Sequence, residues 1–229
     1  MSSLQSRRPE RVIRDAAATA ALVVEHTVVE RPSLVPELVL RTAPSLVAIW
    51  EATEAAATAE RPPPYWAYPS VGGQAVARFV LDRPELVAGL RVLDFATGGG
   101  LVALAARRAG AAAVTAVDVD PTAIVAAAVN AQANALDVDL VLGDVVDTHP
   151  DVDVVLTGDI CYERGSARRI AAWLRTLARD HDLVLLGDGG RAFLPGEGLQ
   201  REACYPVHTT REIESAEQRD ATVWRVLPR

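Results

Sequence analysis

Four aspartates occupy positions from which side chains can bind a ligand. Asp94, Asp118, Asp144 and Asp159 each stand at or just beyond the end of a short apolar run. If these runs are parallel strands, the carboxylates converge on the crevice above one edge of a sheet. A turn or a helix cap could explain any one of them. Four in succession favour a site that accepts hydrogen bonds from hydroxyl and amine groups.

The first of these aspartates opens a glycine-rich loop. The run from Asp94 to Gly100 reads Asp-Phe-Ala-Thr-Gly-Gly-Gly and joins a short apolar segment to an Ala-rich one. Glycines such as Gly98 and Gly100 allow positive φ and let a ligand approach the main chain. The helix expected beyond them offers free N–H groups. The loop therefore predicts a site for a nucleotide-like ligand, and the small Ala96 still allows close approach.

The spacing of these residues limits which nucleotide-like ligand can bind. The loop lacks the G-x-G-x-x-G pattern, which disfavours an NAD-linked dehydrogenase, and no Walker pattern is present. Asp118 is suited to ribose hydroxyls, Asp144 to the exocyclic amine of adenine, and Asp94 to the neighbourhood of a ligand amino group. A neutral or cationic adenosine ligand fits better than a pyrophosphate, because no second phosphate-binding element follows. This favours S-adenosylmethionine.

Alternating strands and helices must position these residues. Apolar runs predict strands at 90–95, 113–117, 139–142, 152–156 and 183–187, and Ala-rich or amphipathic segments predict helices at 100–109, 122–135 and 166–179. This alternation is typical of an α/β fold with a doubly wound, parallel sheet. Residues 200–226 are expected to add two closing strands, of which 222–226 is the clearer.

The chain before the first of these strands has a different character. Residues 1–61 are expected to form a helical N-terminal extension, with helices over 12–29 and from 44 to 59. Three prolines then lead into an aromatic loop that contains Trp66. Gly72-Gly73 are expected to form a flexible joint before a helix over 74–81. The predicted domain boundary therefore lies between residues 61 and 62.

Composition excludes several classes of function. The net charge of −7 disfavours nucleic acids and anionic membranes as partners. All 23 basic residues are arginine, so the chain has no lysine base, Schiff-base lysine or P-loop lysine. Its 2 cysteines and 4 histidines have no metal-site spacing. No apolar run is long enough for a membrane span and no signal-type apolar core is apparent, so a cytoplasmic location is expected.

Several motifs together resemble a known family. The loop from Asp94 to Gly100 resembles the first motif of class I (seven-stranded) methyltransferases, with Ala96 where glycine is usual. Further short motifs resemble, in order, the electron transfer flavoprotein β-subunit lysine methyltransferase family: Pro64-Tyr65-Trp66-Ala67, Gly72-Gly73-Gln74-Ala75, Gly158-Asp159-Ile160-Cys161-Tyr162, Gly187-Asp188-Gly189-Gly190-Arg191 and Thr222-Val223-Trp224. Asp159 and Tyr162 match that group's (D/E)-x-x-(Y/F) motif.

The resemblance implies a fold, a reaction and further site residues. The fold is a Rossmann-like, mostly parallel sheet of seven strands, and the reaction is lysine N-methylation from S-adenosylmethionine on a protein such as the electron transfer flavoprotein β-subunit. Asp159 and Tyr162 would be catalytic, with Asp159 orienting the amine. Gln74 and Trp66 would join the cofactor site. Two alternatives remain: a small-molecule N-methyltransferase, and a cofactor-binding module with little catalysis.

Overall fold

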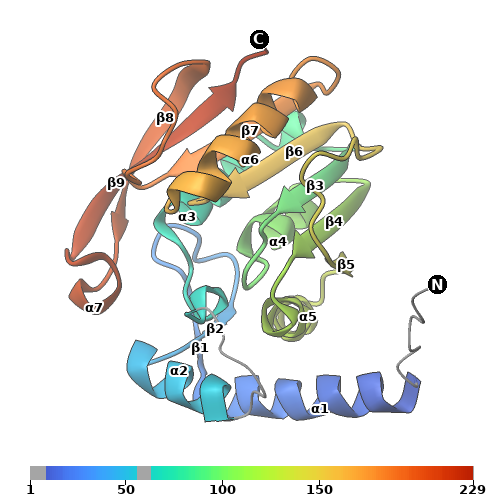
Figure 1. Ribbon diagram of the computed structural model, residues 1–229, viewed down its shortest axis with the longest axis vertical. Helices are drawn as coiled ribbons and strands as arrows, with labels where there is room; N and C mark the ends of the chain where they lie inside the picture. The colour runs from blue at the N-terminus through green and yellow to red at the C-terminus, as the bar shows by residue number, and fades with distance from the viewer. Residues whose placement is uncertain (1–8, 56–62, 229) are drawn as a thin grey trace.

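The core of the molecule is a mixed sheet of seven strands. A computed structural model describes residues 9–55 and 63–228 (Figure 1). The strand order is β5-β4-β3-β6-β7-β9-β8. The strands are β3 (Arg91–Phe95), β4 (Ala113–Asp118), β5 (Asp139–Leu142), β6 (Val154–Gly158), β7 (Leu183–Asp188), β8 (Leu199–His208) and β9 (Gln218–Val226). The first five are parallel, and β9 pairs antiparallel with both β7 and β8. The predicted doubly wound α/β fold is confirmed.

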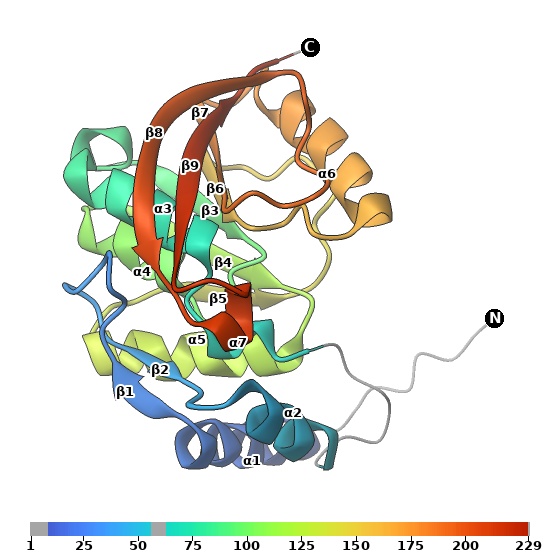
Figure 2. The ribbon, with the colours of Figure 1, turned by 90° about the vertical axis from the view of Figure 1, so that its left-hand side faces the viewer.

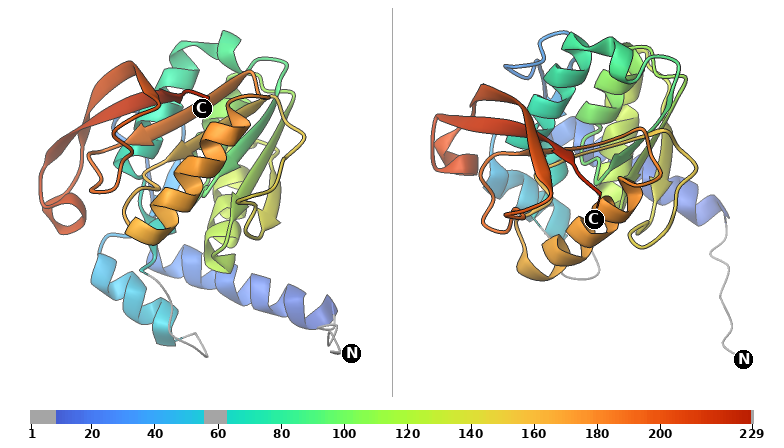
Figure 3. Two further views of the ribbon diagram at one scale, coloured as in Figure 1. Left: turned by 45° about the horizontal axis from the view of Figure 1, so that its top comes forward. Right: turned by 90° about the horizontal axis from the view of Figure 1, so that it is seen from above.

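Helices cover both faces of this sheet. They are α3 (Val71–Asp82), α4 (Leu101–Arg108), α5 (Pro121–Asn134) and α6 (Arg164–Leu177), with short 3-10 turns η1 (Tyr65–Ala67) and η2 (Pro84–Leu86) and the short helix α7 (Arg211–Glu214). α3 and α4 pack on one face and α6 on the other. Figure 3 shows α6 lying across the strands on its own side of the sheet. None of the helices in the described part of the chain has an apolar stretch of the length that a membrane span needs.

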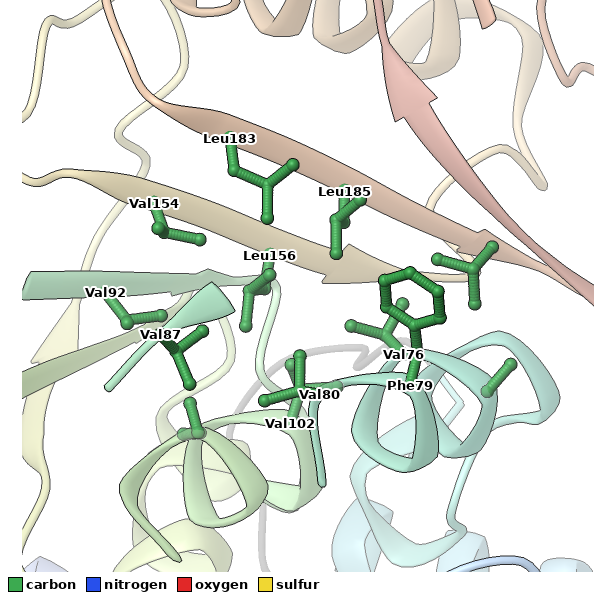
Figure 4. Packing of buried hydrophobic residues seen from close by; sticks show 14 of the residues in the cluster. Val76, Phe79, Val80, Val87, Val92, Val102, Val154, Leu156, Leu183 and Leu185 are labelled. Carbon is green, nitrogen blue, oxygen red and sulfur yellow. The ribbon is translucent and has the colours of Figure 1, made fainter. Parts of the chain in front are cut away.

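Alternating side chains on the central strands build the two layers of the core. Leu183 and Leu185 of β7 point toward α3 and α4, whereas Val184 and Leu186 pack toward α6. Figure 4 shows Leu183 and Leu185 facing the buried side chains of α3 and α4, such as Phe79. Both faces are apolar because a parallel strand inside a doubly wound sheet is covered on both sides. This is why continuous apolar runs predicted these strands well.

The Gly-Gly pair is part of helix α3, and the predicted flexible joint is wrong. A Cβ on Gly72 would come within 2.4 Å of the Gly187 carbonyl oxygen, and one on Gly158 within 2.5 Å of the Gly73 nitrogen. The glycines therefore let the start of α3 lie directly on the ends of β6 and β7. Ser70 caps this helix by accepting a hydrogen bond from the Gly73 N–H, 3.1 Å away.

The N-terminal part combines helices with a small hairpin. Helix α1 (Pro9–His26) and helix α2 (Leu46–Ala55) flank two antiparallel strands, β1 (Val28–Glu30) and β2 (Leu40–Thr42). The expected helices are present, although α1 ends at His26, whereas the hairpin was not predicted. The expected continuation of the second helix beyond residue 55 and the proposed boundary at 61 and 62 lie outside the described residues. Figure 1 shows α1 and α2 side by side at the end of the molecule opposite the C-terminus.

Candidate active site

One large cavity lies where strands β3, β4 and β6 end. Its volume is about 460 Å³, within the usual range for small-molecule sites. The walls come from the glycine-rich loop, the aromatic loop around η1, strand β2, the start of α3 and the α7 turn. The lining includes Leu40, Arg41, Thr42, Leu46, Tyr65, Trp66, Tyr68, Ser70, Gly73, Asp94, Ala96, Thr97, Gly98, Gly99, Asp118, Val119, Asp120, Gly158, Asp159, Ile160, Tyr162, Arg191, Ile213 and Glu214.

The glycine-rich loop forms one wall of this cavity, as predicted. Gly98 and Gly100 have φ of 54° and 88°, and Gly100 precedes the first residue of α4. Ala96 also has a positive φ, 56°. An L-residue pays a steric cost in this left-handed region, which explains why glycine is usual at such a position. Ala96 thus takes the backbone conformation of a glycine while carrying a side chain.

Asp94 holds the loop in place from beneath. It is buried, and its Oδ2 accepts hydrogen bonds from the Thr97 hydroxyl and from the Ala103 N–H at 2.9 Å. Burial raises the pKa of Asp94 to about 7 because the charged form loses solvation. Asp94 both lines the cavity and fastens the loop to α4, so it can influence a ligand directly and through the loop geometry.

Asp118 connects the end of β4 to the same loop. Its Oδ2 accepts a hydrogen bond from the Gly98 N–H at 2.9 Å, and its Oδ1 accepts one from the Asp120 N–H at 2.9 Å. Burial raises the pKa of this carboxyl above its usual value. Each carboxylate oxygen can accept a further bond, and Asp118 lines the cavity. This position is compatible with the predicted role of accepting hydrogen bonds from ribose hydroxyls.

Three predicted site residues, Gly100, Asp144 and Gln74, are not among those that line the cavity. The Asp144 oxygens accept bonds from the Val146 N–H and from the Arg169 guanidinium, each at 2.9 Å. Gln74 is buried between the aromatic loop and the N-terminal part: its Nε2 donates to the Pro69 carbonyl at 3.1 Å, and its Oε1 accepts from the Leu34 N–H at 3.3 Å. Gln74 therefore supports the cavity wall from behind, and Asp144 is engaged in a surface ion pair.

Asp159 lies at the end of β6 with its carboxylate surrounded by donors. It has a φ of 54° and is buried. Its Oδ2 accepts a bond from the Gly72 N–H in the first turn of α3, at 2.5 Å. Its Oδ1 accepts bonds from the Gly189 N–H at 3.0 Å and from the Arg191 Nε at 2.8 Å. These contacts hold the carboxylate in one orientation at the cavity wall.

Arg191 extends this network to the β8–β9 hairpin. Its Nη1 and Nη2 donate to the two carboxylate oxygens of Glu214, at 3.0 and 2.5 Å. The Glu214 carboxylate also forms an ion pair with Arg219, whose Nε lies 3.2 Å from one of its oxygens. Figure 2 shows β8 and β9 running side by side with α7, which carries Glu214, at their tip. Although Arg191 belongs to a quoted motif, neither it nor Glu214 was predicted to be functional.

Aromatic side chains form the mouth of the cavity. The rings of Tyr65 and Tyr162 lie 5.4 Å apart between centroids with an interplanar angle of 50°. Tyr65 is 58% exposed and Tyr162 is 55% exposed, whereas Trp66 is buried in the wall behind them. Tyr162 was predicted to be catalytic and Trp66 to join the cofactor site, and both side chains line the cavity. Tyr65 belongs to the Pro-Tyr-Trp-Ala motif, but no role was predicted for it from the sequence.

The hairpin strand β2 and helix α5 complete the site. Asn130 of α5 accepts a bond from the Arg41 N–H at 2.8 Å and donates to the Gly99 carbonyl at 2.8 Å. One side chain thus connects the N-terminal part to the glycine-rich loop. The contribution of Arg41 to the wall was not predicted, since a three-residue strand carries too little pattern to be recognised.

The site carries no sign of metal chemistry within the described part of the chain. No group of three or more His, Cys, Asp or Glu side chains there could hold an ion. Cys161, next to Tyr162, is a free and buried thiol, and burial raises its pKa to about 12. A neutral thiol is a poor nucleophile. The groups that do line the cavity include carboxylates, arginine side chains, main-chain N–H groups of the glycine-rich loop and aromatic rings.

Comparisons with known proteins agree with this geometry. The profile of the ribosomal protein L11 methyltransferase (PrmA) family matches residues 79–160. Among solved structures, a putative RNA methyltransferase from Pyrococcus horikoshii has a TM-score of 0.57 at 16% identity, covering 74% of this chain and 90% of that one. A putative SAM-dependent methyltransferase from Streptococcus mutans has a TM-score of 0.58 at 12% identity, covering 88% and 56%. These likenesses show the fold.

More similar relatives show the family. The electron transfer flavoprotein beta subunit lysine methyltransferase of Danio rerio is 35% identical over 211 residues, which cover 89% of this chain and 81% of that protein. The protein of the same name from Homo sapiens is 33% identical over 217 residues, covering 91% and 82%. The one from Xenopus laevis is 33% identical, covering 96% and 91%. The chain therefore belongs to the electron transfer flavoprotein beta subunit lysine methyltransferase family.

Proposed function

We propose that this protein is an S-adenosylmethionine-dependent protein-lysine N-methyltransferase whose substrate is the electron transfer flavoprotein β-subunit or a protein with similarly exposed lysines. One observation carries the proposal: the glycine-rich loop, the Asp159 carboxylate and the aromatic mouth all line one cavity. The first suits an adenosine ligand, and the other two suit an amine. The family to which the chain belongs supports both the reaction and the substrate.

The residues of the cavity fit the proposed cofactor chemically. Asp118 presents carboxylate oxygens beside the glycine-rich loop, where ribose hydroxyls can donate to them. Ala96 and Gly98 bring the main chain to the cavity wall. A ligand with a positive sulfonium is also favoured by the acidic side chains of Asp94 and Asp118 at this wall, because a nearby positive charge stabilises their ionised forms. When bound, S-adenosylmethionine supplies an electrophilic methyl group.

The side chains at the mouth are suited to receive a lysine. A lysine amine has a reference pKa of about 10.4 and must lose a proton before it can attack a methyl group. Tyr65 and Tyr162 offer ring faces to the amine in its charged form during entry. Asp159 then accepts a hydrogen bond from the amine and directs its lone pair into the cavity.

Asp159 acts in this scheme as a fixed acceptor. Gly72, Gly189 and Arg191 already donate to its two oxygens, so the carboxylate is held by the fold in its orientation. Deprotonation of the amine by water is sufficient, and no side chain is assigned as a strong general base. Positioning then supplies most of the catalysis.

The surface charge supports a protein partner over a nucleic acid. The net charge of −7 repels phosphate backbones and attracts segments rich in lysine. We therefore propose that exposed lysines on an otherwise folded protein are presented to the Tyr65–Tyr162 mouth, and that neither nucleic acid nor a membrane surface is required.

Incubation with isotope-labelled S-adenosylmethionine tests this function. The purified protein is mixed with the electron transfer flavoprotein β-subunit and, separately, with a cell lysate divided into protein and small-molecule fractions. We expect label on lysines of the β-subunit or of another protein band. Label only in small metabolites would instead indicate a small-molecule N-methyltransferase. Cofactor binding in calorimetry without turnover on either sample would indicate a binding module.

A further inference from the structure

Arg191 lies between two buried carboxylates from distant parts of the chain. Its Nε contacts Asp159 at 2.8 Å, and its two terminal nitrogens contact Glu214. The Asp159 and Glu214 side chains are only 5% and 4% exposed, and that of Arg191 is 23% exposed. All three line the cavity. A bidentate arginine fixes geometry more strongly than a single charge contact.

The turn after β7 is shaped to present this arginine. Asp188 Oδ1 accepts hydrogen bonds from the Gly190 N–H at 2.6 Å and the Arg191 N–H at 2.9 Å. Gly190 has a φ of 88°, which favours glycine. The Gly189 N–H donates to Asp159 from the same turn. The Gly-Asp-Gly-Gly-Arg motif is thereby explained: each of its last three residues orients or contacts the network around Asp159.

We propose that Arg191 is a positioning residue for methyl transfer: held by Glu214, it fixes the Asp159 carboxylate and offsets its charge, so that the bound lysine amine is more readily neutral. The inference rests on the proposed lysine methyltransferase activity. An unpaired carboxylate beside the amine would favour the ammonium form, which has no lone pair for attack. A paired carboxylate can still accept a hydrogen bond from the neutral amine.

The groups that face Arg191 and Asp159 support this charge balance. Burial disfavours the charged form of Arg191, but its hydrogen bonds to Glu214 and the charge of Asp159 together raise its pKa above the usual arginine value. Burial raises the pKa of Asp188 above its usual value and that of the Cys161 thiol to about 12, so the thiol adds no negative charge beside Asp159 at neutral pH. Arg219 of β9 adds a positive charge to this network: its Nε lies 3.2 Å from a Glu214 carboxylate oxygen, and its Nη1 donates to the Gly189 carbonyl at 3.3 Å.

In the reaction itself, atoms and charge balance without another reactant. The lone pair of the neutral lysine Nζ forms a bond to the methyl carbon, while the carbon–sulfur bond breaks and its electron pair stays on sulfur. The sulfonium becomes a neutral thioether, and the nitrogen becomes a methylated ammonium that later releases a proton to water. Arg191 acts before this step, through the protonation state and orientation of the amine.

The test is the pH dependence of kcat for lysine methylation between pH 6.5 and 10, measured with saturating cofactor and protein substrate. Arg191→Met should move the rising limb of the profile to higher pH by about 1 unit or more. The resulting loss of about 10-fold at neutral pH should largely disappear at high pH. Arg191→Lys and Glu214→Gln should show smaller shifts, because each preserves part of the network. Arg225→Met is the matched control, since Arg225 pairs with Glu202 on the same hairpin at 2.8 Å and does not line the cavity.

The possible outcomes separate this inference from the proposed function. An unshifted profile for Arg191→Met, whether the rate is normal or uniformly low, overturns the positioning role. Loss of S-adenosylmethionine binding in calorimetry also overturns it, because Arg191 would then be a cofactor ligand. If Arg191→Met does not fold, the profiles of Arg191→Lys and Glu214→Gln decide in the same way. An inactive parent protein would refute the proposed methyltransferase function itself.

Discussion

Ala96 provides a test of the site geometry that depends on a single methyl group. Its φ of 56° lies in the left-handed region, and its side chain is exposed at the cavity wall. Alanine in this conformation costs roughly 1–2 kcal/mol of steric strain. Glycine avoids this strain, but it lowers the free energy of unfolding by about 0.4–1 kcal/mol because the unfolded chain has more conformational freedom. Ala96→Gly should therefore increase the free energy of unfolding by about 0.5–1 kcal/mol.

Thermal unfolding without cofactor measures this effect. For a chain of this length, the gain corresponds to a rise in Tm of about 1–4 °C. Ala135, which ends helix α5 with a φ of 53°, should respond in the same direction when changed to glycine. Ala128→Gly is the control of opposite sign, since Ala128 is exposed inside α5, where glycine costs roughly 1 kcal/mol.

The comparison among these three variants is decisive. If Ala96→Gly lowers the Tm as Ala128→Gly does, the loop does not hold residue 96 in a left-handed conformation. The description of the cofactor wall would then be wrong. Calorimetry with S-adenosylmethionine should in addition show that Ala96→Gly binds at least as tightly as the parent, because glycine leaves more room at the wall.

Three further predictions concern the aspartates. Burial raises the pKa of Asp94 to about 7, above the unfolded value of about 3.9, so the folded state binds the extra proton and stability falls as pH rises through this window. Asp94→Asn should therefore gain stability relative to the parent between about pH 4 and 7, and a constant difference in Tm would contradict this. Asp118→Ala should weaken S-adenosylmethionine binding about 10- to 100-fold, whereas Asp144→Ala should leave calorimetric affinity nearly unchanged; equal losses would place Asp144 in the adenine site. Asp159→Asn should lower the methylation rate at least about 10-fold while cofactor affinity is largely retained, and full activity would remove Asp159 from the orienting role.

The alternating core was predictable because its signal is local. Strand β7 is a continuous apolar run buried on both faces, and the expected strands at 90–95 and 113–117 match β3 and β4 within one residue. The two closing strands were also expected, although β9 begins at Gln218, four residues before the clearer segment. Amphipathic and Ala-rich helices between these strands left little alternative to a doubly wound sheet.

The missed features depend on contacts between distant parts of the chain. Gly72-Gly73 resembles a loop signal, yet these glycines are required because α3 touches the main chain of β6 and β7. The pairing of Arg191 with Glu214 joins residues 23 positions apart through an unpredicted turn. The family resemblance predicted that Gln74 binds the cofactor. Its side-chain amide instead connects the N-terminal part and the aromatic loop to α3.

Mass spectrometry of protein methylation in cells with and without this protein tests the central claim most directly. Lysines of the electron transfer flavoprotein β-subunit, or of another protein, should carry methyl groups only when the protein is present. An Asp159→Asn variant restored to the deficient cells should methylate those lysines less than the parent does, while the Arg225→Met control should restore the parent level. Identical lysine methylation with and without the protein would contradict the proposed function.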